Sequence, residues 1–194
     1  MITTNPEREA VAVPNESDNL FRISWLHAMD EHGETPMSRA VKCGHRSLLE
    51  IIVEQSDRDS DARPKSDTAL QRAAAWGLTE IIRKKVDEQA ADINERDDRG
   101  ETPLHKAARM GHFNAVRELI RLGADLNAAD TLGLRPLHWT AVNGRQDIAR
   151  LLLHFKADPN VRERFAGGLT PLALAKLLGR EEFADSLAEY GATW

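Results

Sequence analysis

The chain has 194 residues, of which 41% are hydrophobic and 29% charged, and its formal net charge is −5. This composition allows a buried core and excludes a wholly disordered chain, and no apolar run approaches the roughly 18 residues that span a membrane. The single cysteine, Cys43, excludes a disulfide within the chain and a cysteine-based zinc finger, while the acidic balance disfavours nucleic acid. We therefore expect neither a membrane nor a nucleic acid as partner.

The N-terminal segment differs in composition from the rest. Residues 1–16 contain two prolines and charges of both signs, and they lack the basic start and apolar stretch of a signal peptide. We expect a mobile tail at 1–16 and a cytoplasmic protein. Over 17–30, Leu20 and Ile23 fall on one helical face, and Ser17 or Asp18 can cap it. This pattern predicts a helix that covers the first apolar unit of the following domain.

From residue 31 onward the sequence repeats itself. The clearest copy begins at Gly100 and reads GETPLHKAA, with Gly111-His112 shortly after it. Similar runs begin at Gly33, Ser66, Gly133 and Gly168. The aligned positions are Thr35, Thr68, Thr102, Arg135 and Thr170, at steps of 33, 34, 33 and 35 residues. Self-similarity at such a period indicates a fold of stacked units.

Each unit can be explained by local backbone chemistry. Gly100 suits a tight turn, Thr102 suits a helix N-cap, and Pro103 suits the first helical position, where its missing N–H costs nothing. Gly111 then ends this short helix, and a second apolar-periodic segment follows before Gly123. The unit is thus predicted to contain two helices joined by a short turn.

These motifs resemble the ankyrin repeat, whose Thr-Pro-Leu-His signature recurs about every 33 residues. The resemblance covers about Gly33 to Gly191 and implies an all-α solenoid of helix-turn-helix units with β-hairpin fingers. It implies a single domain over 17–194, with a capping helix at 17–30 and repeats at about 31–63, 64–96, 97–129, 130–162 and 163–194.

Two of the five units, Gly100–Ala129 and Gly133–Val161, are close to the family pattern, and the other three are degenerate. Arg135 stands where the capping threonine is expected, which removes a cap of about 1 kcal/mol. In the second unit, Ser66 and Ala69 replace glycine and proline, and the register of its second helix stays open. The last unit has acidic residues between Phe183 and Leu187, which is typical of a polar C-terminal capping repeat.

For the residues that could bind a metal or act in catalysis, we prefer a structural explanation to a functional one. His105 and His138 belong to the Thr-Pro-Leu-His motif, which implies a ring bonded to backbone between repeats. The run Asp57–Asp61 imitates the start of a calcium loop, but Ala62 and Thr68 replace the glycine and glutamate that such a loop needs. Cys43 lacks the base and oxyanion site of a nucleophile. We expect no enzyme, no cofactor and no metal.

The resemblance implies that partners bind at the fingertips and at the ends of the first helices. At matched positions, the first four units carry fingertip residues, which in the third unit are Asp98, Arg99 and Glu101. The expected protein-binding residues are Trp76, Arg99, Arg109, Met110, Leu132, Leu134, Asn143 and Lys65. Trp76 could instead fold back over its own degenerate repeat, and Trp139 is expected to pack.

The sequence therefore favours a monomeric adaptor or inhibitor that binds another protein through its concave face without turnover. An alternative is an immunity protein or a delivered effector that occludes a target protein. The mild acidity would suit a basic target, although −5 over 194 residues is a small charge. A purely structural scaffold is a further alternative, and it would associate with itself.

Overall fold

The computed structural model describes residues 68–88, 91–164 and 168–193. The chain divides into two compact units, Met1–Leu49 and Glu50–Trp194, and every described residue lies in the second. The expected tail, capping helix and first repeat lie outside the described residues, as do Lys65, Cys43 and the acidic run Asp57–Asp61. The described helices are α4 (Ala69–Ala75), α5 (Thr79–Asp87), α6 (Pro103–Met110), α7 (Phe113–Arg121), α8 (Pro136–Asn143), α9 (Gln146–His154), α10 (Pro171–Leu177) and α11 (Glu181–Glu189).

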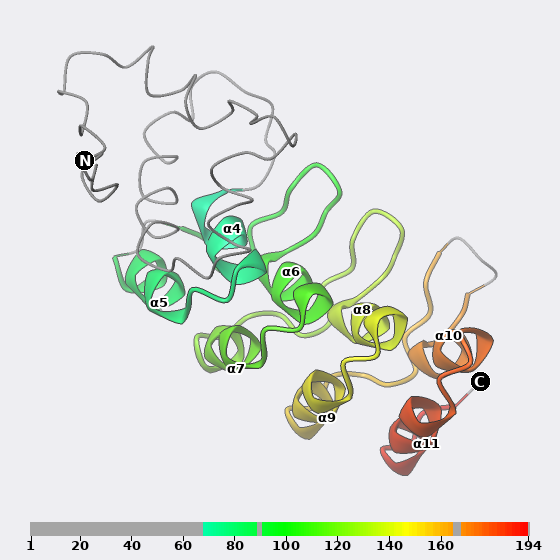
Figure 1. Cartoon of the computed structure of the whole chain (residues 1–194). Helices are drawn as coiled ribbons and strands as arrows, with labels where there is room; N and C mark the ends of the chain where they lie inside the picture. Colours follow the sequence, from blue (N-terminus) through cyan, green and yellow to red (C-terminus); the bar gives the residue numbers. More distant parts are fainter. Residues whose placement is uncertain (1–67, 89–90, 165–167, 194) are drawn as a thin grey trace, which may run out of the picture. The chain divides into compact units, whose positions relative to one another are not determined.

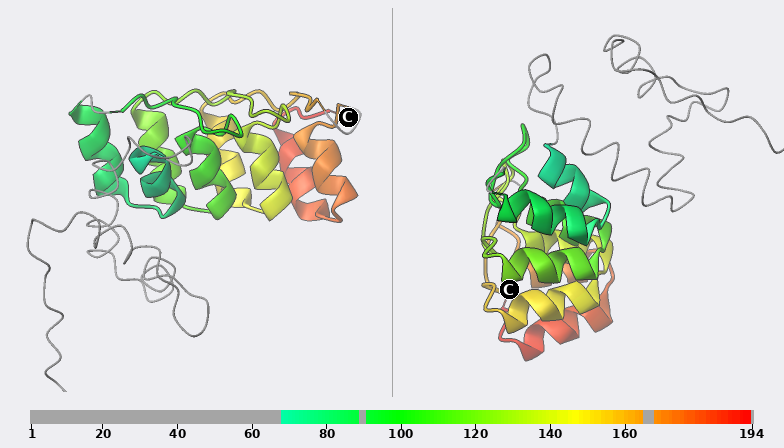
Figure 2. Two further views of the ribbon diagram at one scale, coloured as in Figure 1. Left: turned by 90° about the horizontal axis from the view of Figure 1, so that it is seen from above. Right: turned by 90° about the vertical axis from the view of Figure 1, so that its left-hand side faces the viewer.

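The helices form consecutive pairs that stack side by side in two rows (Figure 1). The first helices of the pairs, α4, α6, α8 and α10, contact one another in order, and the second helices, α5, α7, α9 and α11, do the same. The loops between pairs project from the row of first helices and run along one end of the helices (Figure 2). This confirms the all-α fold of helix-turn-helix units that the sequence predicts.

The first helices begin where the repeated motif predicts. Thr68, Thr102, Arg135 and Thr170 are the N-cap residues of α4, α6, α8 and α10, and proline opens the last three of these helices. The Thr170 hydroxyl accepts a hydrogen bond from the Ala173 N–H at 3.2 Å. The Arg135 side chain has no oxygen that could accept such a bond. His138 Nδ1 nevertheless accepts from the Arg135 N–H at 3.1 Å, so one of the two hydrogen bonds of a capping box is kept.

The second helices supply the rest of the core. In α7, Ala115, Val116 and Leu119 are fully buried, and in α5 the buried pair is Ile81 and Ile82. This pair sets the register of α5 and turns Lys84 toward solvent. In α11, Phe183 and Leu187 are buried while the carboxylates around them are exposed, as expected of a polar outer face.

A buried carboxylate closes each loop between pairs. Asp97 Oδ1 accepts from the N–H groups of Arg99 and Glu101 at 2.9 and 2.8 Å. Asp130 and Glu163 bind backbone N–H groups in the same way in the next two loops. No described residue lies in a strand, because few backbone hydrogen bonds cross each loop, so the expected hairpins are turns in these ranges.

Candidate functional site

The tips of neighbouring loops lie side by side. The Arg99 carbonyl accepts from the Thr131 N–H at 2.9 Å, and the Leu132 carbonyl accepts from the Arg164 N–H at 3.0 Å. These bonds join three successive loops into one continuous edge. We call its exposed residues the loop tips, namely Asp98, Arg99, Thr131, Leu132 and Arg164.

A second line of exposed residues lies where the first helices end. Met110 and Leu178, each one residue before a turn glycine, are 49% and 48% exposed, and Leu177 is 73% exposed. Trp76 and Asn143 occupy the matched positions in the other pairs and are half-buried. We call these five residues the first-helix ends. Each first helix starts at a loop and runs about 12 Å, so its outer face lies between the two lines.

Sequence reasoning missed Leu177 and Leu178. The signal was available, since both precede Gly179 just as Met110 precedes Gly111. The polar cap that the sequence predicts for the last unit follows from its second helix alone. Its first helix, α10, nevertheless ends in two exposed leucines, so the polar surface is confined to α11.

A charged cluster lies between the loop tips and the helix ends. Lys106 Nζ is 2.7 Å from an Asp97 carboxylate oxygen and 3.3 Å from a Glu101 oxygen. Arg109 pairs with Glu101 at 3.2 Å and lies over the Trp139 ring, 5.3 Å from its centroid. Trp139 Nε1 also donates to Asp130 at 3.3 Å, in agreement with the expected packing role of this residue.

Glu101, expected at a fingertip, is only 2% exposed, which corrects that expectation. Its carboxylate turns inward because Lys106 and Arg109 lie beneath it. Burial by itself raises the pKa of Asp97, but the hydrogen bonds from Lys106 and from backbone N–H groups outweigh it and hold that pKa below its usual value. The cluster therefore keeps the Asp97 carboxylate ionised and holds both acids away from solvent.

The other expected binding residues divide into two groups. Arg99, Met110 and Leu132 are exposed. Leu134 is half-buried and its carbonyl accepts from His105, while Asn143 Nδ2 donates to the Trp139 carbonyl at 2.9 Å. Whether any of them binds a partner stays a prediction.

The two motif histidines bond to backbone on both ring nitrogens. His105 Nδ1 accepts from the Thr102 N–H at 3.0 Å, and its Nε2 donates to the Leu134 carbonyl of the next unit at 3.2 Å. Burial lowers the pKa of His105 from its usual 6.5 to about 4, and burial likewise lowers the pKa of His138. Both rings therefore stay neutral near pH 7, in agreement with a structural role.

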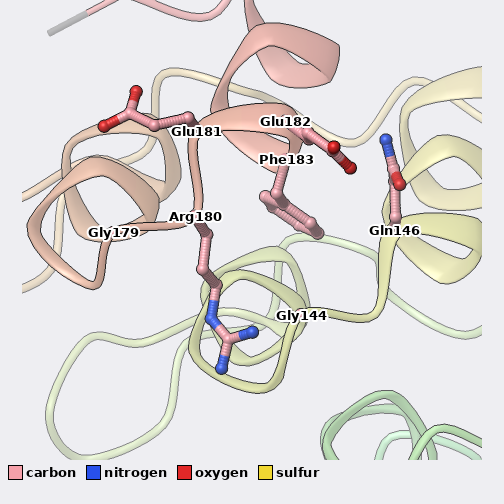
Figure 3. Close-up of a pocket in the computed structure, with 7 residues that line it drawn as sticks. All are labelled: Gly144, Gln146, Gly179, Arg180, Glu181, Glu182 and Phe183. Carbon is pink, nitrogen blue, oxygen red and sulfur yellow. The ribbon is translucent and has the colours of Figure 1, made fainter.

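An open pocket of about 410 Å³ lies beside the turn between α8 and α9 (Figure 3). Arg180 extends toward Gly144, and its guanidinium donates to the Val142 carbonyl at 2.9 Å. Phe183 is buried, and Glu181 and Glu182 are exposed. The cation is thus already bound to backbone and the two acids are solvated, so these groups do not converge on a ligand.

Histidine, cysteine, aspartate and glutamate side chains form no group of three that could hold a metal ion within 68–88, 91–164 and 168–193. Across the same ranges, every helix is too short or too polar to cross a bilayer.

Comparison with known proteins agrees with the architecture. Residues 84–163 match the family model described as ankyrin repeats, in three copies. The chain is 25% identical over 126 residues to a transient receptor potential cation channel subfamily A member 1 homolog from Caenorhabditis elegans, a match that covers 61% of this chain and 10% of that protein. It is 32% identical over 94 residues to alpha-latrocrustotoxin-Lt1a from Latrodectus tredecimguttatus, covering 48% of this chain and 7% of the toxin.

A third relative is the mouse protein fem-1 homolog A-like, which is 32% identical over 96 residues, or 50% of this chain and 14% of the relative. The chain thus spans a seventh or less of the length of these relatives. Together with the stacked helix pairs, these matches identify the repeated unit. Residues 84–163 consist of ankyrin repeats, and the chain is an ankyrin-repeat protein.

Proposed function

We propose that this protein is a non-catalytic adaptor or inhibitor that binds a partner protein through the surface between the loop tips and the first-helix ends. Ankyrin repeats imply a protein–protein interaction module. The observation that carries the proposal is the exposure of three large apolar side chains at the first-helix ends, namely Met110, Leu177 and Leu178. A large apolar residue in water gains little for folding, whereas exposed apolar residues with polar surroundings mark binding sites.

The arrangement suits recognition of a protein surface. Met110, Leu177 and Leu178 can be desolvated by a partner, and Leu132 adds an apolar contact at the loop edge, 42% exposed. The Lys106–Asp97–Glu101 ion pairs fasten the loop before α6 to that helix and give this part of the surface a rigid base. Binding then needs little reordering of this chain, which keeps the entropic cost of association low. The protein would act as a monomer.

The test is partner capture from a lysate of the source cell with three tagged proteins of matched helicity: the wild type, a Met110→Glu/Leu178→Glu variant, and a Phe155→Glu control. The exposed fraction of Phe155 is 48%, which matches those of Met110 and Leu178. Phe155 differs in position, because it follows α9 in the other row of helices. We expect a protein, identified by mass spectrometry, that the wild type and the control retain and the double variant loses at least tenfold.

Equal retention by all three proteins would place binding elsewhere and contradict the proposal. The identity of the captured protein also separates the alternatives. A toxin or a host-cell target would indicate an immunity protein or a delivered effector, whereas a component of a resident complex would indicate an adaptor.

A further inference from the structure

The loops present a charge to solvent that their composition does not indicate. Over 96–101, 129–134 and 162–164 the chain has four arginines and five acidic residues. Four of these acids, Asp97, Glu101, Asp130 and Glu163, turn inward to bind backbone N–H groups or cations. The arginines are all exposed, namely Arg96, Arg99, Arg162 and Arg164, and Asp98 is the one exposed acid within these three ranges.

Two of the arginines are well placed to bind a ligand. Arg96 and Arg162 each donate to a backbone carbonyl near the loop base. The guanidinium groups of Arg99 and Arg164, in contrast, have no hydrogen bond or ion pair within the part of the chain that the structure describes. Leu132 lies between them on the same edge, joined to Arg164 by the 3.0 Å backbone bond.

The spacing of these side chains fits an extended peptide. Packed helices lie about 8–10 Å apart, so two steps along the stack place Arg99 and Arg164 about 16–20 Å from each other. An extended chain advances about 3.3–3.6 Å per residue, so about five or six residues cover this span. Two carboxylates at that spacing could pair with the arginines while an apolar side chain midway contacts Leu132.

We propose that the loop tips bind an extended acidic segment of the partner protein, with carboxylates at Arg99 and Arg164 and an apolar residue on Leu132. This inference rests on the proposed function and adds the chemistry of the partner. It reverses the expectation from net charge, because the exposed loop edge is basic although the whole chain is acidic. A protein segment fits better than a nucleic acid, since the centre of the edge is occupied by Leu132, an apolar side chain that offers a base no aromatic ring on which to stack.

The test is selection from a displayed library of random nine-residue peptides by three proteins. These are the wild type, an Arg99→Glu/Arg164→Glu variant, and an Arg117→Glu control. Arg117 is exposed on α7 in the other row, so the control reverses a charge outside the loop tips. Circular dichroism confirms equal folding of the three proteins. The best wild-type peptide is then labelled with fluorescein and its affinity measured by fluorescence polarisation.

We expect peptides enriched in Asp or Glu pairs five or six positions apart with an apolar residue between them. The double variant should bind the labelled peptide at least tenfold more weakly, because two attractive charges become repulsive, and the control should stay within twofold. Raising NaCl from about 0.05 to about 0.5 M should weaken wild-type binding severalfold, since salt shortens the range of exposed charges.

Four outcomes would overturn the inference. Selected peptides without paired acids, or equal binding by the double variant, would exclude acid recognition at the loop tips. A labelled oligouridylate of 20 nucleotides that binds the wild type but not the double variant, while no acidic peptide does, would identify nucleic acid instead. Selection of no peptide at all also rejects this inference, whereas the capture experiment with Met110 and Leu178 still decides the proposed function.

Discussion

A glycine in the left-handed region follows each described first helix, and in three units the space above it is used by a neighbour. His112 donates to the Ala75 carbonyl at 2.8 Å, and Arg145 and Arg180 reach the Met110 and Val142 carbonyls in the same way. Each side chain passes where a Cβ on the preceding turn glycine would lie. The glycine therefore allows both a positive φ and a bond between units, and a cation near a helix C-terminus is favourable.

Replacement of Gly144 tests this packing directly. In Gly144→Ala the new Cβ would overlap the Arg180 guanidinium at φ +64°, whereas in Gly179→Ala it meets nothing within 4 Å at φ +70°. Both variants lose about 1–2 kcal/mol from the left-handed backbone. We expect Gly144→Ala to lose about 1 kcal/mol more in urea unfolding, because the bond from Arg180 to the Val142 carbonyl is also displaced. Equal losses would show that Arg180 contributes nothing there.

At the scale of the elements, one position in the first helix links each pair to the next. Gln71, His105 and His138 all accept from the N–H of their own N-cap residue and donate to a carbonyl of the following unit. Gln71 performs with an amide what the histidines perform with a neutral imidazole. Ala173 holds the matched position in α10 and its side chain cannot make these bonds.

The histidines make the free energy of unfolding depend on pH. Gln71 occupies the matched position in α4, so glutamine is the replacement for a control variant. Because His105 has a pKa of about 4 when folded and about 6.5 when unfolded, the unfolded state binds more protons between these values. The contribution of neutral His105 to the free energy of unfolding is complete above pH 6.5 and falls by about 2–3 kcal/mol as pH drops to 4. His138 acts in the same direction.

We expect a His105→Gln/His138→Gln variant to retain the links, as Gln71 does, and to lose less stability than the wild type between pH 7 and 4. The measurement is the free energy of unfolding in urea at several pH values. Parallel pH curves for both proteins would show that the histidines are not the cause of the acid sensitivity, since carboxylates titrate in both.

For the molecule as a whole, the described helix pairs make their main contacts with the pairs next to them. Stability in such a stack is a sum of units and of the interfaces between neighbours. Among the described pairs, α6–α7 and α8–α9 each have two such interfaces, whereas α10–α11 has one, with α8–α9.

Hydrogen exchange should follow this difference. We expect backbone amides in α10 and α11 to exchange at least about tenfold faster than those in α6 to α9, because the pair with one interface opens at a lower free energy. Exchange followed by mass spectrometry on peptides from each helix measures it. Uniform protection of all these helices would indicate that the stack opens as one cooperative unit instead.

The sequence by itself determined the repeat, the helix starts and the turns. Thr102, Pro103 and Gly111 set the ends of α6, and their counterparts set the ends of α8 and α10, because caps, proline and glycine act within a few residues. The same local rule, applied to the last unit, would have found the exposed Leu177 and Leu178. The line of first-helix ends was therefore largely available from the sequence.

The tertiary structure alone decided which charges face the solvent. Glu101 and Arg99 lie two residues apart in one loop, and both were expected at the fingertip, yet one is buried and the other exposed. Glu101 turns inward because Lys106 and Arg109 approach it from the next helix, and Arg99 is held outward by a backbone bond to Thr131 in the next repeat. The net charge of the chain includes buried and exposed groups alike. In the loops, most of the acids are buried against partners from the backbone and from neighbouring helices, so the exposed edge of the loop tips is basic although the chain is acidic.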